Sequence, residues 1–216
     1  MHLSRQNIRE YLTLKGINRV IKTLIFSDLL MMGSFGLIVP VFAVFITDFI
    51  SGGTVEVVGI ASTVYLLTKS LGQLLAAELI DRIKGERDDF LSMVIGSVVM
   101  CSSYLLYLLV HTPMQLYIVQ FIIGLATAFT FPSWMAIYTR HIDSDKEGKE
   151  WGMYFTLTDL AGAGTAAIGG VIAYNLGFKP LFVIVAGFGI ISSLLLLLVK
   201  NDMRMPIKKK RLKKSK

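Results

Sequence analysis

Three ionisable side chains lie within long apolar stretches of this 216-residue sequence: Asp28, Lys69 and Asp159. A charge among apolar groups is costly unless it is paired or hydrated, so such residues often bind ions or substrates or exchange protons. Asp28 is the strongest candidate. Its carboxylate lies about six residues inside its stretch, roughly 9 Å from the polar end, which suits protonation or attraction of a cation. The alternative is a carboxylate that is hydrated near that polar end.

Lys69 and Asp159 have two interpretations. Lys69 is near the middle of its stretch, and Asp159 is about eight residues, or roughly 12 Å, inside another. One interpretation is a buried ion pair between them, within one molecule or across a two-fold axis. The other is that Lys69 extends to a polar surface or lines a cavity and attracts anions.

The stretches that carry these residues have the length of transmembrane helices. The sequence is 54% hydrophobic and 17% charged, with a mean hydropathy of +0.63, which is too apolar for an ordinary soluble domain. Helices are the expected form, because lipid offers backbone groups no other partners and about 20 residues cross the hydrocarbon layer. We therefore predict an all-α membrane protein with six spans: Thr23–Ile46, Val57–Ile80, Phe90–Val110, Met114–Tyr138, Trp151–Tyr174 and Pro180–Val199.

The basic residues predict the orientation of these spans. All 22 Lys and Arg residues except Lys69 and Lys179 fall in four segments: the leader (residues 1–22), the second loop (Asp81–Asp89), the fourth loop (Thr139–Glu150) and the tail (residues 200–216). These four segments lie on one side of a six-span protein. The positive-inside rule therefore predicts that both ends are cytoplasmic.

The chain divides into three parts on this basis. Residues 1–22 form a basic leader, which is either an amphipathic helix on the membrane surface or a frayed segment. Residues 23–199 form the six-helix bundle. Residues 200–216 form a basic cytoplasmic tail, in which each Lys or Arg near anionic lipid contributes ~1 kcal/mol to membrane attachment. Membrane lipids are therefore expected partners.

Several classes of function are disfavoured. The histidines are scattered, and we see no spacing typical of metal ligands, of a nucleophile and its base, or of a nucleotide-binding loop. We therefore expect neither an enzyme nor a cofactor or metal site. The basic tail has no interleaved aromatic residues, so a nucleic-acid partner is not expected either.

Four segments follow patterns that occur together in one transporter family. They are Gly36-Leu-Ile-Val-Pro-Val-Phe, the run from Gln73 to Arg87, Gln120-Phe-Ile-Ile-Gly-Leu-Ala with Phe131-Pro-Ser-Trp, and Lys146-Glu-Gly followed by Trp151-Gly. In this order they resemble the first helix, the second loop, the fourth helix and the start of the fifth helix of the drug-exporter branch of the major facilitator superfamily. The resemblance covers nearly all of residues 20–200.

The second loop is similar to the family signature G-x-L-A-D-R-x-G-R-K. Asp81, Arg82, Gly85 and Arg87 hold its charged and glycine positions, although Ala77 replaces a glycine and one extra residue precedes the turn. An acidic residue at a helix end and basic residues after a glycine turn can pair across a cytoplasmic seam and latch one state of a gate. The alternative is a solvated loop whose charges only fix the topology.

The fourth helix departs from the family at one position. Gln120 stands where the pattern R-x-x-x-G has a buried arginine that is linked to proton coupling in antiporters, which argues against proton antiport by that route. Pro40 and Pro132 lie at similar depths in the first and fourth spans. Each removes a backbone hydrogen bond, so we expect both to permit helix bending.

The resemblance also implies how a pathway would be formed. Family members usually have twelve helices in two halves, each made of two inverted three-helix repeats, with substrate bound between the halves. This chain resembles one amino-terminal half. We therefore expect a parallel homodimer that transports a small molecule by alternating access. Spans one and four would line its cavity, and spans two and five would lie at its interface.

Two alternatives remain open. One is a module without transport activity, such as a lipid scramblase, an assembly partner or a scaffold. The other is one half of a heterodimer. A lipophilic or cationic substrate is implied only by the resemblance and by Asp28.

Overall fold

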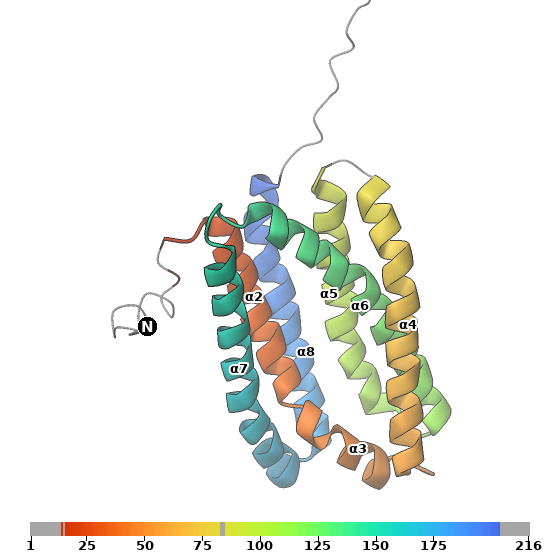
Figure 1. The fold of residues 1–216 in the computed structure, drawn as a ribbon. Coiled ribbons are helices and arrows are strands. Elements are labelled where there is room, and N and C mark those ends of the chain that lie inside the picture. The colour runs from red at the N-terminus through yellow and green to blue at the C-terminus, as the bar shows by residue number, and fades with distance from the viewer. Residues whose placement is uncertain (1–13, 15, 83–84, 204–216) are drawn as a thin grey trace, which may run out of the picture.

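The computed structural model describes residues 14, 16–82 and 85–203, and in these ranges it contains helices and no strands (Figure 1). The leader before residue 14 and the tail after residue 203 lie outside the described residues. The helices and 3-10 segments are α2 (Arg19–Gly36), η1 (Val39–Val41), α3 (Phe42–Phe49), α4 (Val55–Arg82), α5 (Arg87–Ser103), η2 (Tyr104–Leu109), α6 (Pro113–His141), α7 (Glu147–Leu176), α8 (Phe178–Leu195) and η3 (Leu196–Asp202).

The helices form the six predicted spans. Each span has 23 to 31 residues and is apolar enough to cross a membrane. The first span combines α2, η1 and α3, the third combines α5 and η2, and the sixth combines α8 and η3. The prediction of six membrane-spanning helices is therefore confirmed, and the chain is a multi-pass membrane protein.

Local sequence signals set several helix ends. The Asn18 side chain accepts a hydrogen bond of 3.0 Å from the Ile21 backbone N–H and caps α2. Thr112 and Gln115 form a capping box at the start of α6, where Pro113 takes the first helical position. Because of the Asn18 cap, the first span begins at Arg19, four residues before the predicted start at Thr23.

Contacts between helices follow an internal symmetry. α2 packs on α7 and α8, α6 packs in the same way on α4 and α5, and α5 packs on α8. If the first span is matched to the fourth, the second to the fifth and the third to the sixth, each of these helix contacts corresponds to another one of the set or to itself. This is the arrangement expected for two inverted three-helix repeats.

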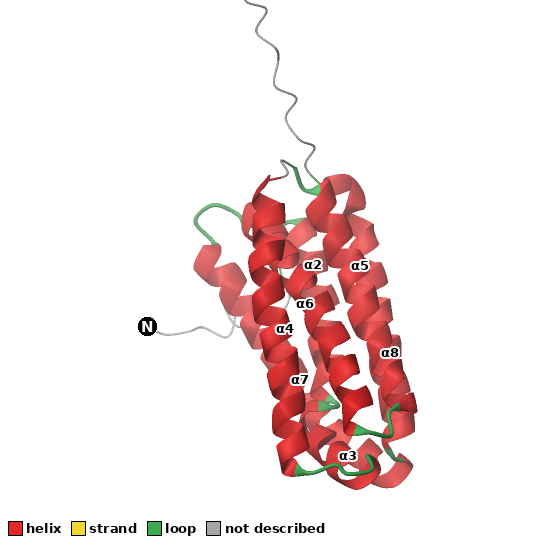
Figure 2. Cartoon of the chain, turned by 90° about the vertical axis from the view of Figure 1, so that its right-hand side faces the viewer, coloured by secondary structure: helices red, strands yellow, loops and turns green. Residues whose placement is uncertain are grey.

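Two helices are covered much less than the others. Few of the apolar positions of α4 and α7 are buried in the bundle. They lie on one side of the molecule, and α5 and α8 lie on the other (Figure 2). α2 and α6, the first helices of the two repeats, make little direct contact with each other. This leaves room between them for the site described below.

The described basic residues gather at one end of the bundle. This end contains the start of α2, the end of α4, the starts of α5 and α7, and the end of the last span (Figure 1). Of the described Lys and Arg residues outside the middle of the spans, only Lys179 lies at the opposite end, at the start of α8.

Candidate functional site

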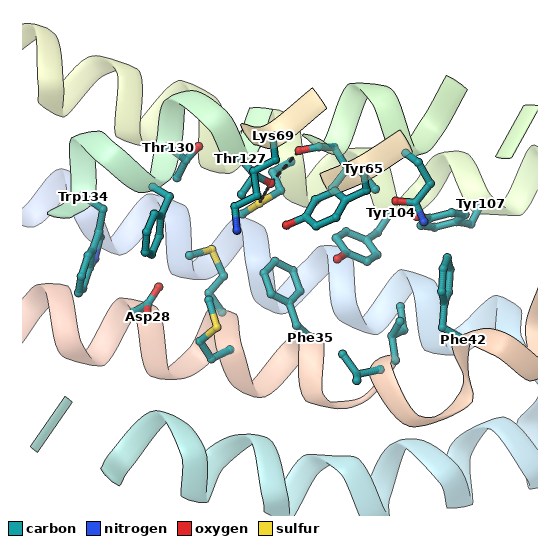
Figure 3. Close-up of a pocket in the computed structure, with 18 of the residues that line it drawn as sticks. Asp28, Phe35, Phe42, Tyr65, Lys69, Tyr104, Tyr107, Thr127, Thr130 and Trp134 are labelled. Carbon is teal, nitrogen blue, oxygen red and sulfur yellow. Dashed lines mark hydrogen bonds between the residues drawn. The ribbon is translucent and has the colours of Figure 1, made fainter. Parts of the chain in front are cut away.

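A cavity of about 510 Å³ lies between the two repeats (Figure 3). Its walls come mainly from α2 and α6, with side chains added by α4, by α5 and η2, and by α7. Most of the lining is aromatic or contains methionine. The polar lining groups are few: Asp28, Lys69, Gln120, Thr127, Thr130 and the hydroxyls of Tyr65, Tyr104, Tyr107 and Tyr154. A mostly apolar cavity with a few convergent polar groups is typical of a small-molecule site.

Asp28 lies in the wall formed by α2 and is only 4% exposed. The Tyr154 hydroxyl on α7 donates a hydrogen bond of 2.6 Å to its Oδ2. The preceding residue fixes the rotation of α2: the Ser27 hydroxyl donates to the Ser192 carbonyl at 2.8 Å, and the Ser192 hydroxyl donates to the Ser27 carbonyl at 2.6 Å. These bonds hold α2 against α8, so the next side chain, Asp28, faces the cavity.

Lys69 extends from α4 into the same cavity and is half-buried (Figure 3). Its Nζ is 5.5 Å from the ring centroid of Phe131 and 5.9 Å from that of Tyr65. Both distances are within the range of cation–π contacts. Gly124 allows α4 to come this close to α6, since a Cβ at that position would be 2.8 Å from the Tyr65 carbonyl oxygen.

The predicted ion pair between Lys69 and Asp159 is wrong within one molecule. Asp159 is exposed on α7 and does not line the cavity. In the described part of the chain, Lys69 has aromatic partners and no carboxylate within 4.0 Å. An ion pair between Lys69 of one copy and Asp159 of a second copy, related by a two-fold axis, stays a prediction.

Three other predicted residues lie in or beside the cavity. Gln120 is 7% exposed and lines it from α6. Pro40 is in η1, where the first span departs from α-helical geometry, and its neighbour Val39 lines the cavity. Pro132 follows the lining residue Phe131, and α6 continues through it as one helix.

The predicted gating loop lies at the basic end, away from the cavity. Arg82 pairs with Glu78 one turn earlier in its own helix, and both side chains are exposed. Asp81 and Arg87 are also exposed and form no ion pair with any residue that the structure describes. Gly85 has a φ of +136°, a conformation that favours glycine.

The buried contacts at this end are formed by neighbouring residues instead. Arg140 at the end of α6 pairs with Asp89 in α5, whose side chain is only 1% exposed. Arg140 also donates to the Gly85 carbonyl at 3.4 Å. His141 Nε2 is 3.7 Å from Glu86 Oε2. The seam between the second loop and α6 is therefore closed by these pairs.

A second polar contact joins the start of α2 to the loop between α6 and α7. Asn18 donates to the His141 carbonyl at 2.6 Å and to Asp143 Oδ1 at 3.1 Å. Lys146 Nζ donates to Asp143 Oδ2 at 3.0 Å. The hydrogen bonds from Asn18 and Lys146 lower the pKa of the Asp143 carboxyl below its ordinary value.

The family model described as Major Facilitator Superfamily matches residues 24–216. This chain belongs to the major facilitator superfamily. The predicted resemblance is therefore confirmed at the level of the family.

Two known proteins illustrate the relationship of this superfamily member. It is 24% identical over 178 residues to the multidrug resistance protein MdtG of Klebsiella pneumoniae (strain 342), a match that covers 78% of this chain and 40% of that protein. It also resembles the solved structure of the POT family transporter PepTSo, with a TM-score of 0.74 and 16% identity over 89% of this chain and 39% of the other. The chain thus spans about 40% of the length of each.

Some residues that contact the site were not predicted from the sequence of this superfamily protein. A buried carboxylate such as Asp28 needs a hydrogen-bond donor, and Tyr154 is that donor. The sequence contains eight tyrosines, and only the packing of α2 on α7 identifies Tyr154 among them. The buried contacts of Asp89 and Glu86 were missed because both lie in a charged loop that looks uniformly solvated in the sequence.

Proposed function

We propose that this protein is a half-size secondary transporter of small molecules that works as a parallel homodimer by alternating access. The observation that carries the proposal is the cavity of about 510 Å³, which places the buried Asp28 carboxylate in an apolar and aromatic lining between the two repeats. Such a lining suits a small molecule with an apolar body, and Asp28 suits a cationic group or a proton.

The second wall of the pathway would come from a second copy. The outward surfaces of α4 and α7 carry exposed apolar side chains, among them Leu71 at 64%, Leu74 at 71% and Leu160 at 60%. A two-fold axis along the membrane normal would place α4 of one copy against α7 of the other and enclose the cavities between them. The clustering of basic residues at one end supports a single orientation, as a parallel dimer requires.

The same clustering supports a location in the cytoplasmic membrane with both chain ends in the cytoplasm. There the basic end would contact the anionic headgroups of the inner leaflet. In alternating access, the break at Pro40 would let the first span bend, and the charged residues of the second loop would form and break pairs across the copies. The name of MdtG, a multidrug resistance protein, supports a small-molecule cargo.

Uptake into proteoliposomes tests the proposal. The purified protein is reconstituted, a mixed panel of small aromatic amines, acids and zwitterions is added outside, and the contents are measured by mass spectrometry with and without pH and sodium gradients. We expect at least one compound to accumulate only with a gradient. Asp28→Asn should reduce that accumulation about tenfold or more, the loss produced by removing ~1.4 kcal/mol of interaction.

The matched control is Asp48→Asn, which removes an exposed carboxylate at the opposite end of the bundle. It should leave accumulation unchanged. If no compound enters faster than into protein-free liposomes under any gradient, the transporter proposal is wrong.

A further inference from the structure

We infer that the preferred ligand of this cavity carries a positive and a negative charge at opposite ends of an apolar body. The inference rests on the proposed function, because it names the substrate class of the same site. It depends on two walls of the cavity that hold opposite charges and do not neutralise each other.

The first wall presents the Asp28 carboxylate. Tyr154 donates to Oδ2, and no other described residue donates to this side chain. Tyr154 also lines the cavity, but it occupies only Oδ2, so the other carboxylate oxygen, Oδ1, is left for a ligand group. An ammonium group is the complementary partner for such a carboxylate, since charge-assisted hydrogen bonds are the strong ones.

The second wall presents the Lys69 ammonium from α4. Its partners are the faces of Phe131 and Tyr65, at 5.5 and 5.9 Å. Contact with a ring face is weaker than a hydrogen-bonded ion pair with a carboxylate or phosphate. An acidic ligand group would therefore gain a partner for Lys69 without having to displace a protein carboxylate.

The two charges face the same space from different helices, and they form no ion pair with each other (Figure 3). Apolar side chains share the lining with the two charges, among them Met31, Met32 and Phe35. A purely cationic ligand would bring a second positive charge into a cavity that already holds Lys69. A purely anionic ligand would bring a second negative charge near Asp28. A zwitterion avoids both costs.

Matched probes test this. One set is para-aminomethylbenzoate, which carries both charges, its primary amide, which keeps only the amine, and para-methylbenzoate, which keeps only the acid. A second set has a biphenyl in place of the benzene ring, so that two separations of charge are sampled. Binding to the full chain in lipid nanodiscs is measured by calorimetry and by thermal shift.

We expect one of the two zwitterions to bind about tenfold tighter than both of its singly charged analogues. Lys69→Gln should reduce the affinity for that zwitterion to the level of the amine-only probe. Asp28→Asn should reduce it to the level of the acid-only probe. Lys69→Arg should keep the preference, because it keeps the charge. Lys179→Gln, which removes an exposed lysine at the end of the bundle, should have no effect.

Two results would overturn the inference. In one, the amine-only probes bind as tightly as the zwitterions and Lys69→Gln changes nothing. In the other, none of the six probes binds. Uptake of the same probes separates this inference from the proposed function. A zwitterion that binds but is never taken up contradicts transport alone, whereas uptake without preference for the zwitterion contradicts the ligand class alone.

Discussion

Asp28 depends on neighbours that belong to other helices. Tyr154 of α7 supplies its hydrogen bond, and the paired Ser27 and Ser192 hydroxyls set the rotation of α2 that turns it toward the cavity. A buried carboxylate held in this way is sensitive to the loss of one donor, because its oxygen would then be left without a partner.

Tyr154→Phe should therefore lower the free energy of unfolding by about 1–3 kcal/mol, since it removes the hydroxyl and keeps the ring. Reversible unfolding in mixed detergent micelles measures this. Tyr174→Phe is the matched control, because Tyr174 is 91% exposed. Equal free energies of unfolding for the two variants would show that the hydrogen bond to Asp28 does not stabilise the fold.

Asp143 gives a prediction for pH. Hydrogen bonds from Asn18 and Lys146 lower its pKa in the folded protein. Its contribution to stability is therefore present at neutral pH and is lost as the pH falls from the ordinary Asp value of about 3.9 through the lowered value. Asp143→Asn should be less stable than the parent at pH 7, and the difference should shrink as the pH falls through this range.

The control for this measurement is Asp145→Asn, on the same loop, where Asp145 is exposed and has a φ of +65° that asparagine also accepts. Its stability should follow the parent at every pH. A difference between Asp143→Asn and the parent that stays constant from pH 7 to pH 3 would contradict the role assigned to the Asp143 charge.

For single residues, the sequence indicated which charges line the cavity better than it indicated their partners. Asp28 and Lys69 stand out because each is a charge in an apolar run, and both line the cavity. The partners were not predictable. Tyr154, Phe131 and Tyr65 lie on other helices or at positions where an aromatic residue is ordinary, so only the packing identifies them.

Helix packing depends on a few close approaches. A Cβ on Gly124 would lie 2.8 Å from the Tyr65 carbonyl oxygen of α4, and a Cβ on Gly169 would clash with the Leu37 backbone at the end of α2. Small residues allow such approaches in lipid, where helix association depends on packing. The α4–α6 contact matters for the site, since it also sets the position of Lys69.

Gly124→Ala should lower the free energy of unfolding by about 1–3 kcal/mol, because the new methyl group forces α4 away from α6. It should also weaken ligand binding that depends on Lys69. Gly164→Ala is the control, since nothing lies within 4 Å of a Cβ there. If Gly124→Ala is as stable as Gly164→Ala, the close packing of α4 on α6 does not depend on a glycine at position 124.

The elements themselves were largely predictable. Hydropathy located all six spans because a lipid-crossing helix must be apolar along its length. Helix ends were less predictable, since charged residues such as Glu147 and Arg82 continue the helices into the aqueous region. The packing roles of the individual glycines in α7 were not predictable either. Gly169 is in close contact, whereas Gly164 and Gly170 face open space, a difference that the sequence does not reveal.

For the whole molecule, we propose that a second copy covers the face on which the cavity lies. Amino-acid composition does not distinguish a helix surface that faces lipid from one that faces another protein in the membrane, because both are apolar. The inverted repeats and the six-helix half followed from the family resemblance, and the fold agrees with them. The position of the partner is a proposal from the low coverage of α4 and α7.

Disulfide cross-linking in native membranes tests whether α4 of one copy lies against α7 of the other. Leu71 and Leu160 lie near the middle of α4 and α7 and are 64% and 60% exposed, and the native Cys101 is buried. The full chain carrying both Leu71→Cys and Leu160→Cys should form a covalent dimer on mild oxidation. Ile95→Cys, on the opposite α5 surface and 59% exposed, should not. A doubly substituted chain that stays monomeric, or a dimer band equally strong for Ile95→Cys, would rule out a parallel dimer with this interface.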